Sequence, residues 1–329
     1  MLLATENAWR FQPHPEVWLL VGAVVGLGWY AARVIAPQLR AAGHPAEITR
    51  RQKRLFILAT VVLWVAADWP MHDIGEQYLY AVHMVQHTLL TMVMPPLFLL
   101  ATPTWLAELI IGSDRVGRIV RTLTRPVVAG VAFNLLIALT HWRTVVDTSH
   151  DNGPFHYGVH LLLVTAALAA WVPIAGPLPE RRLGTPGQLA YLFSMSIIPT
   201  IPAAWLTFSE NPVYPSYDVA ERVFGLDVIN DQQMAGLIMK VGVGFYLWTL
   251  MAVLFFRWAL RGQADDRRSR GVVAVGPDGS VRGRQARDGG SPPSRDALGD
   301  DGDLTWAEVQ AELDRLGPAP VERLPGTPT

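Results

Sequence analysis

Residues 78–101 read YLYAVHMVQHTLLTMVMPPLFLLA, and this stretch decides the fold. It is long enough to cross a bilayer, because a transmembrane helix needs about 20 mostly apolar residues. It nevertheless carries His83 and His87, which are four residues apart and so share one face of a helix. Ionisable side chains are costly inside a bilayer and usually mark function there. We therefore expect a membrane helix with a chemical role, and metal binding is the first to consider.

The composition of the whole chain is typical of a membrane protein. Half of its 329 residues are hydrophobic, and the net charge of −1 gives no reason to expect a nucleic-acid partner. Cysteine is absent, which excludes disulfides, thiolate metal sites and cysteine nucleophiles. A bound metal must therefore be held by histidine, methionine, carboxylate or backbone oxygen. The first residues lack the features of a cleaved signal peptide, so we expect no removal.

Seven apolar segments predict an all-α fold, a polytopic bundle of seven transmembrane helices in the lipid bilayer. They cover residues 17–36, 55–69, 78–101, 126–142, 156–174, 188–208 and 234–260. The second and fourth are short for a span, although their flanking tryptophans, Trp64, Trp69 and Trp142, suit the bilayer interface.

The positive charges gather in alternate connections between these segments. One set of connections, with the start of the tail, holds Arg40, Arg50, Arg51, Lys53, Arg54, Arg115, Arg118, Arg121, Arg125, Arg181, Arg182, Arg261, Arg267, Arg268 and Arg270. The other set holds only Arg10, Arg143 and Arg222. Cytoplasmic loops are enriched in Lys and Arg, so this bias predicts an N-terminus outside and a C-terminus in the cytoplasm.

Three regions follow from this topology: an extracytoplasmic segment 1–16, a membrane domain 17–260 and a cytoplasmic tail 261–329. Residues 262–303 are rich in Gly, Arg, Asp, Ser and Pro and cannot bury a core, so we expect disorder. Residues 303–316, DLTWAEVQAELDRL, have apolar residues at helical spacing. They predict a short amphipathic helix, either marginal on the tail or a docking helix for a partner.

Seven of the nine histidines fall in the predicted outer half of the bundle. They are His72, His83, His87, His141, His150, His156 and His160. A lone histidine at a helix end is more often an interfacial polar residue, and a buried one often makes an interhelical hydrogen bond. Two pairs at four-residue spacing and a histidine on a further helix favour a metal site. Imidazole suits Cu, Zn, Fe and Ni, whereas thioether sulfur favours Cu(I).

The candidate metal ligands are His72, His83, His87, His141, His156 and His160. Asp68 precedes His72 by four residues and could orient its ring. Lys240 lies inside the seventh segment and requires a carboxylate partner, for which Asp68 and Asp231 are candidates. The pair would be either a structural ion pair or part of a proton relay or ligand-release switch. Met84 points about 100° away from His83 around the helix, so it would join the site only through a second helix, and is otherwise core filler.

Several blocks of sequence resemble the CtaG-type cytochrome c oxidase assembly factors. The run HMVQHTLLTMVMPPLFLLATP (83–103) resembles that family's HMxQH…PPL…P signature. Further blocks match in order: WPMH (69–72), HWRTVVD (141–147), FHYGVH (155–160), WVPIAGP (171–177), FSENPVYPSY (208–217) and DQQMAGLIM (231–239). The resemblance covers roughly residues 17–260.

This resemblance implies a multi-pass plasma-membrane protein that assembles a haem–copper oxidase and is linked to its copper supply. The family's histidines fall on His83, His87, His141, His156 and His160, and Asp231 lies in the DQQ block. The implied partners are oxidase subunits and an extracytoplasmic copper donor, and the implied cargo is copper, expected as Cu(I). No catalytic residue is expected.

Three other functions fit the same residues. The protein could be a structural scaffold for oxidase subunits whose histidines serve only as interhelical bonds. It could be an intramembrane zinc hydrolase with histidine and Asp68 ligands. It could bind haem, although two histidines on one helix face cannot sit on opposite sides of a haem, so axial ligands would have to come from different helices.

Overall fold

The structure is a computed structural model that describes residues 8–112, 115–219, 221–270, 273–275 and 281–283. The chain divides into two units, Met1–Phe255 and Phe256–Thr329. The first unit contains a bundle of helices. In the second unit, the helix that ends the bundle continues to Arg270, and strand β1 (Val273–Val275) pairs antiparallel with β2 (Val281–Gly283).

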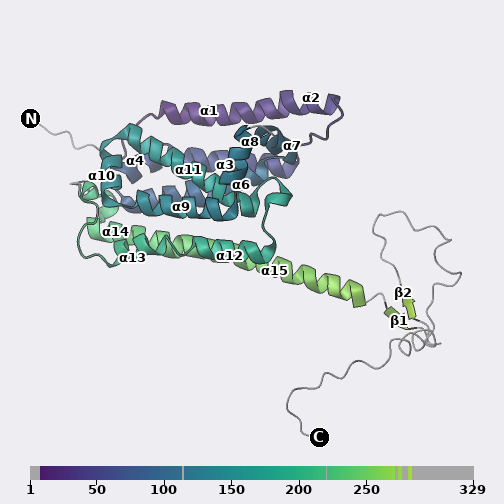
Figure 1. The fold of residues 1–329 in the computed structure, drawn as a ribbon. Coiled ribbons are helices and arrows are strands. Elements are labelled where there is room, and N and C mark those ends of the chain that lie inside the picture. Colours follow the sequence, from purple (N-terminus) through teal and green to yellow (C-terminus); the bar gives the residue numbers. More distant parts are fainter. Residues whose placement is uncertain (1–7, 113–114, 220, 271–272, 276–280, 284–329) are drawn as a thin grey trace, which may run out of the picture. The chain divides into compact units, whose positions relative to one another are not determined.

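Helices make up almost all of the first unit (Figure 1). They are α1 (Pro15–Tyr30), α2 (Ala36–Ala41), α3 (Arg50–Ala67), α4 (Met71–Gln77), α5 (Tyr80–Thr88), α6 (Met94–Ala101), α7 (Thr104–Ile111), α8 (Arg115–Leu123), α9 (Pro126–Thr140), α10 (Arg143–Asp151), α11 (Gly153–Ala175), α12 (Thr185–Met195), α13 (Thr200–Phe208), α14 (Val228–Leu237) and α15 (Val243–Arg270). Single π-helical turns, Ala31–Ile35, Leu89–Val93 and Ile238–Gly242, join α1 to α2, α5 to α6 and α14 to α15. Short 3-10 turns lie at Pro179–Arg181, Pro215–Tyr217 and Val223–Gly225.

Six stretches within the described residues are long and apolar enough to cross a membrane, which confirms the predicted all-α polytopic class. They are Pro15–Ala41, Arg50–Gln77, Tyr80–Ala101, Gly153–Ala175, Thr185–Phe208 and Val228–Gln263. The fourth predicted segment corresponds to α9, whose 15 residues extend only about 22 Å. Together with α8, from which it is bent by 71°, α9 makes the seventh crossing if the pair counts as one span.

The connections meet at alternate ends of the bundle, as the predicted crossings require. At one end Tyr217 donates to the carbonyl of Gly75 (3.0 Å), and Ser216 donates to Asp147 (3.1 Å). At the other end Trp105 donates to the carbonyl of Glu47 (3.2 Å). We call the first of these ends the histidine end: it comprises residues 8–14, 68–87, 141–160 and 209–227, which contain every histidine except His44.

The stretch α5–α6 is the central span of the bundle. Helix α5 packs against α4 and α14, and α6 packs against α3 and α11. Below the histidine end the core is apolar, and Phe133, Trp171, Leu192 and Leu247 are at most 1% exposed there. The span is therefore surrounded by other helices, so its histidines face protein.

Two prolines in this span leave backbone carbonyls without helical donors. Pro95 and Pro96 have no N–H to donate to the carbonyls four residues earlier, those of Thr91 and Met92. The indole of Trp171 donates to Thr91 (2.8 Å), and the hydroxyl of Tyr246 donates to Met92 (2.9 Å). Neighbouring helices thus satisfy the carbonyls that the prolines free, and the span stays helical across the π turn.

Local contacts set the position at which α5 begins. The carboxylate of Asp231, on α14, accepts the backbone N–H groups of Tyr80 (2.7 Å) and Ala81 (2.9 Å). Gly75 on α4 lies so close to α5 that a Cβ there would be 3.0 Å from the backbone nitrogen of His83. The glycine therefore permits the close approach of α4 to the histidine-bearing helix.

Some boundaries differ from those predicted. The sixth span is broken between α12 and α13, where Pro199 cannot donate to a preceding carbonyl. Helix α15 continues beyond 260 to Arg270, past the start of the tail that was expected to be disordered. The amphipathic helix predicted at 303–316 lies outside the described residues.

Candidate metal centre

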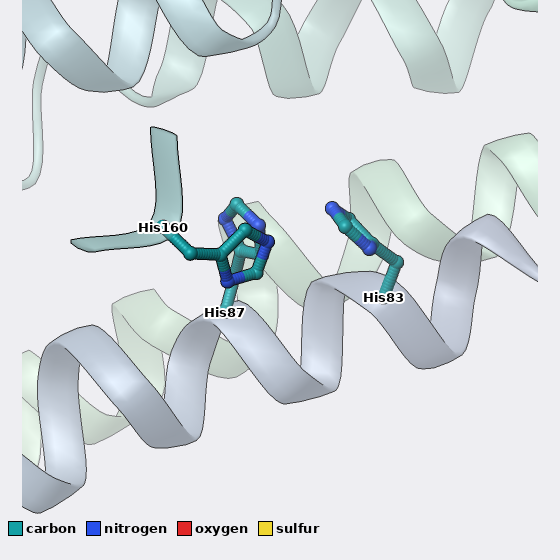
Figure 2. Close-up of side chains that lie close together, drawn as sticks. All are labelled: His83, His87 and His160. Carbon is teal, nitrogen blue, oxygen red and sulfur yellow. The ribbon is translucent and has the colours of Figure 1, made fainter. Parts of the chain in front are cut away.

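Three histidines from two helices converge at the histidine end. His83 and His87 project from one face of α5, and His160 reaches them from α11 (Figure 2). The ring centroids are 4.3 Å apart for His83 and His87, 4.8 Å for His87 and His160, and 5.7 Å for His83 and His160. One nitrogen from each ring lies within 4.8 Å of the others. We call these residues the three-histidine cluster.

Two ring nitrogens of the cluster lack a partner in the described part of the chain. Nδ1 of His83 and Nε2 of His87 are buried and have no hydrogen-bond partner among the described residues. A buried polar group without a partner costs about 1–3 kcal/mol. The rings of His83 and His87 also line a small cavity of about 30 Å³, which has room for one water molecule or ion. The unpaired nitrogens and the cavity together fit a cation held by imidazoles.

A second group of possible ligands lies beside the first. Nε2 of His72, on α4, is 2.9 Å from Oε2 of Glu76, and Nδ1 of His156, on α11, is 3.6 Å from Oε1 of the same carboxylate. One ligand atom from each of the three residues lies within 4.8 Å of the others. We call them the glutamate cluster. His72 and His156 are 4% and 2% exposed, so the cluster is largely shielded from solvent.

His156 connects the two clusters. Its ring stacks on that of His160, with centroids 4.3 Å apart, and lies 6.1 Å from the ring of His83. Its Nδ1 atom contacts Glu76 and the hydroxyl of Ser149 (3.1 Å), whereas Nε2 is buried without a partner among the described residues. Both edges of the ring are thus placed for polar interactions, and only one has them.

The predicted ligand His141 lies apart from both clusters. Its Nδ1 atom donates to the carbonyl of Ile137 (2.7 Å), and its Nε2 atom is 3.5 Å from the sulfur of Met84. The ring centroid is 6.4 Å from that of His87. Met84 thus contacts a histidine of another helix, as the sequence required of it, but this histidine belongs to neither cluster.

Two predicted carboxylate roles are replaced by others. Asp68 does not orient His72: it accepts the indole N–H groups of Trp18 (2.9 Å) and Trp64 (2.7 Å). The physical reason is that α3 ends at Ala67 and Asp68 has extended backbone, so the four-residue spacing no longer places both side chains on one helical face. Asp231 contacts the backbone at the start of α5.

The prediction that Lys240 forms an ion pair with Asp68 or Asp231 is also wrong. Its ammonium group donates to the hydroxyl of Thr200 (2.7 Å) at an exposed position of the bundle, whereas Asp68 and Asp231 accept hydrogen bonds from other groups. A long side chain can keep its charge near the surface, so a lysine in an apolar segment need not point into the bundle.

Glu76, the carboxylate shared by His72 and His156, was not among the predicted site residues. The available signal was its position four residues after His72, on a helix that begins only at Met71. Gln86, whose amide nitrogen lies 3.1 Å from Nδ1 of His72, was not predicted either. Gln86 comes from α5, so the bond depends on how α4 and α5 pack and has no signature in the spacing.

The N-terminal segment borders the glutamate cluster. Nε2 of His14 is 3.0 Å from Oδ2 of Asp73, and its ring is 4.9 Å from that of His72. Burial lowers the pKa of His14, but hydrogen bonds and charge from Asp73 and Glu16 raise it by more, so the net pKa is raised. The ring therefore ties residues 8–14 to α4 through Asp73, and this contact is strongest when the ring is protonated.

The fold and the site define a polytopic membrane protein with clustered imidazoles at one end of its helical bundle. The family model for the cytochrome c oxidase caa3 assembly factor (Caa3_CtaG) matches residues 6–261. The chain belongs to this family, which confirms the resemblance carried by the HMxQH run and the blocks after it. No curated protein and no solved structure shows a significant match.

Proposed function

We propose that this protein binds copper, as Cu(I), at the three-histidine cluster and assists its delivery to a haem–copper oxidase during assembly. Family membership supports the role in oxidase assembly. The observation that carries the copper part is the convergence of His83, His87 and His160 with buried, unpaired ring nitrogens.

The donor set suits a transferable ion. Imidazole is a borderline ligand that accepts copper, and three neutral donors add no charge that would favour a divalent ion. No thiolate is present to hold Cu(I) tightly, because the chain has no cysteine. A site of this kind can take up copper and release it again.

The same observation disfavours a purely structural role for these histidines. A scaffold that used them as interhelical hydrogen bonds would have paired their buried nitrogens, since most buried polar groups in proteins are bonded. Here Nδ1 of His83 and Nε2 of His87 have no partner in the described part of the chain. A ligand is a better account of them than packing.

The proposed setting follows from the charge pattern. The connections at the end away from the histidines carry the excess of Lys and Arg, so that end is assigned to the cytoplasm and the N-terminus to the outside of the plasma membrane. The three-histidine cluster then lies in the outer half of the bilayer. It would receive copper from an extracytoplasmic donor and pass it to oxidase subunits.

Copper analysis of the purified protein tests this function. The full chain in detergent is loaded with Cu(I) under reducing conditions, with Zn²⁺ as competitor, beside His83→Ala/His87→Ala and the control His44→Ala. We expect about one copper per chain in the parent and the control, loss in the double variant, and less active oxidase in cells carrying it. Background copper in the parent, or equal copper in the double variant, would exclude the cluster as the site.

A further inference from the structure

The glutamate cluster differs from the three-histidine cluster in its chemistry. It offers one carboxylate between two imidazoles, with Oε2 of Glu76 at 2.9 Å from His72 and Oε1 at 3.6 Å from His156. An ionised carboxylate adds a full negative charge and an oxygen donor. Two imidazoles with one carboxylate are a ligand set known for Zn²⁺, and borderline divalent ions such as Cu²⁺ accept the same donors.

The surroundings of His72 suit a metal ligand. A metal-bound histidine usually donates its second ring N–H to an oxygen, which fixes the ring. The amide of Gln86 lies at Nδ1 of His72, and its Oε1 atom is buried and without a partner among the described residues. An amide has a donor and an acceptor at its two ends, so turning it brings Oε1 to Nδ1–H. Nε2 of His72 would then be free to bind a cation.

His156 supplies a further independent observation. It is 2% exposed, and the ring nitrogen that faces Glu76 is Nδ1, 3.6 Å from Oε1, so this ligand atom is buried beside the carboxylate. The cavity of about 30 Å³ is lined by Glu76 and His156 as well as by His83 and His87. The glutamate cluster therefore has buried ligand atoms and space beside them.

We propose that His72, Glu76 and His156 form a second metal site, specific for a divalent cation such as Zn²⁺ or Cu²⁺, with Gln86 as the residue that positions His72. The site stands on its own ligands. Only the idea that the protein holds two ions at once, on either side of His156, rests on the proposed Cu(I) function of the three-histidine cluster.

The test is Cu²⁺ binding to the full-length protein in detergent without reductant, followed by titration and by electron paramagnetic resonance. The parent for this test is the His83→Ala/His87→Ala variant, which removes two ligands of the other cluster. We expect it to keep one Cu²⁺ per chain with a spectrum of mixed nitrogen and oxygen donors. Adding Glu76→Gln should weaken binding at least about tenfold, because even an outer-shell change typically lowers affinity 10- to 100-fold.

A matched control separates ligation from charge. Asp73→Asn removes a buried carboxylate from the same helix, one that contacts His14. It should leave the Cu²⁺ affinity within about twofold. His72→Asn provides a second ligand variant should Glu76→Gln not fold, as judged by its elution profile and unfolding midpoint, and Gln86→Leu should weaken binding less than either.

Equal Cu²⁺ binding with and without the Glu76 and His72 substitutions would overturn the second site, and so would an equal loss in Asp73→Asn. Failure of the proposed function looks different: the wild-type chain would bind no Cu(I), while the Cu²⁺ site that depends on Glu76 would persist.

Discussion

The indole nitrogen of Trp171, on α11, donates a 2.8 Å hydrogen bond to the backbone carbonyl of Thr91 in the central span. The carbonyl is available because Pro95 has no N–H, and both partners are buried. A side chain 80 positions away thus completes the backbone bonding of the span that carries His83 and His87.

Replacing Trp171 with phenylalanine tests this relationship. The Trp171→Phe variant keeps an aromatic ring but leaves the carbonyl of Thr91 unpaired, and a buried group in that state costs about 1–3 kcal/mol. We expect a lower unfolding midpoint in detergent. Trp205→Phe is the control, since Trp205 is 50% exposed, and it should change the midpoint much less. Equal midpoints for the two variants would refute the assigned role.

The substitution Gly75→Ala tests the close approach of α4 to α5. Its Cβ would lie 3.0 Å from the backbone nitrogen of His83, so one helix must shift, and overpacking of this kind costs about 1–3 kcal/mol. We expect lower stability and weaker Cu²⁺ binding at the glutamate cluster, measured by thermal unfolding and titration. At Gly158, on α11, a Cβ meets nothing within 4 Å, so Gly158→Ala should not destabilise the protein. Gly75→Ala with unchanged stability and binding would contradict the packing argument.

Asp231 is expected to hold the start of α5. Its carboxylate accepts two backbone N–H groups, those of Tyr80 and Ala81, and hydrogen bonds to a charged group contribute about 1.5–3 kcal/mol. In Asp231→Asn the single amide oxygen replaces both acceptors, so we expect about 2 kcal/mol of destabilisation in a denaturant titration. Asp218→Asn, at a carboxylate that is 52% exposed, serves as control. Equal stability of the two variants would show that Asp231 does not hold the start of α5.

The carboxyl group of Asp227 is expected to make the free energy of unfolding depend on pH in the acidic range. Hydrogen bonds from the backbone N–H groups of Asn230 and Ile229 lower its pKa below the ordinary 3.8. A lowered carboxyl pKa stabilises the fold above the unfolded-state value, and this contribution is lost as the pH falls through the folded-state pKa. Asp227→Ala should therefore lower the unfolding midpoint at pH 7, and the difference from the wild type should shrink below about pH 3.8. A constant difference down to pH 2 would show that the carboxylate charge is irrelevant to this helix start.

The sequence by itself determined the class of the protein and its family. Apolar runs of about 20 residues can satisfy their backbone in lipid only as helices, so the spans followed from composition alone. Alternating Arg and Lys predicted alternating connections, and the contacts at the two ends of the bundle agree with that alternation. The four-residue spacing placed His83 with His87, because an i,i+4 pair shares a face on any α-helix.

Only the tertiary structure decided which side chains from different helices meet. Spacing along one helix says nothing about its rotation against a neighbour. It therefore could not join His160 to His83 and His87, set His141 apart beside Met84, or bring Glu76 between His72 and His156. The expected pair of Asp68 and His72 failed for the same reason, since the chain leaves the helix between them. Helix breaks and packing distances, which arise from contacts remote in sequence, fix the ligand geometry.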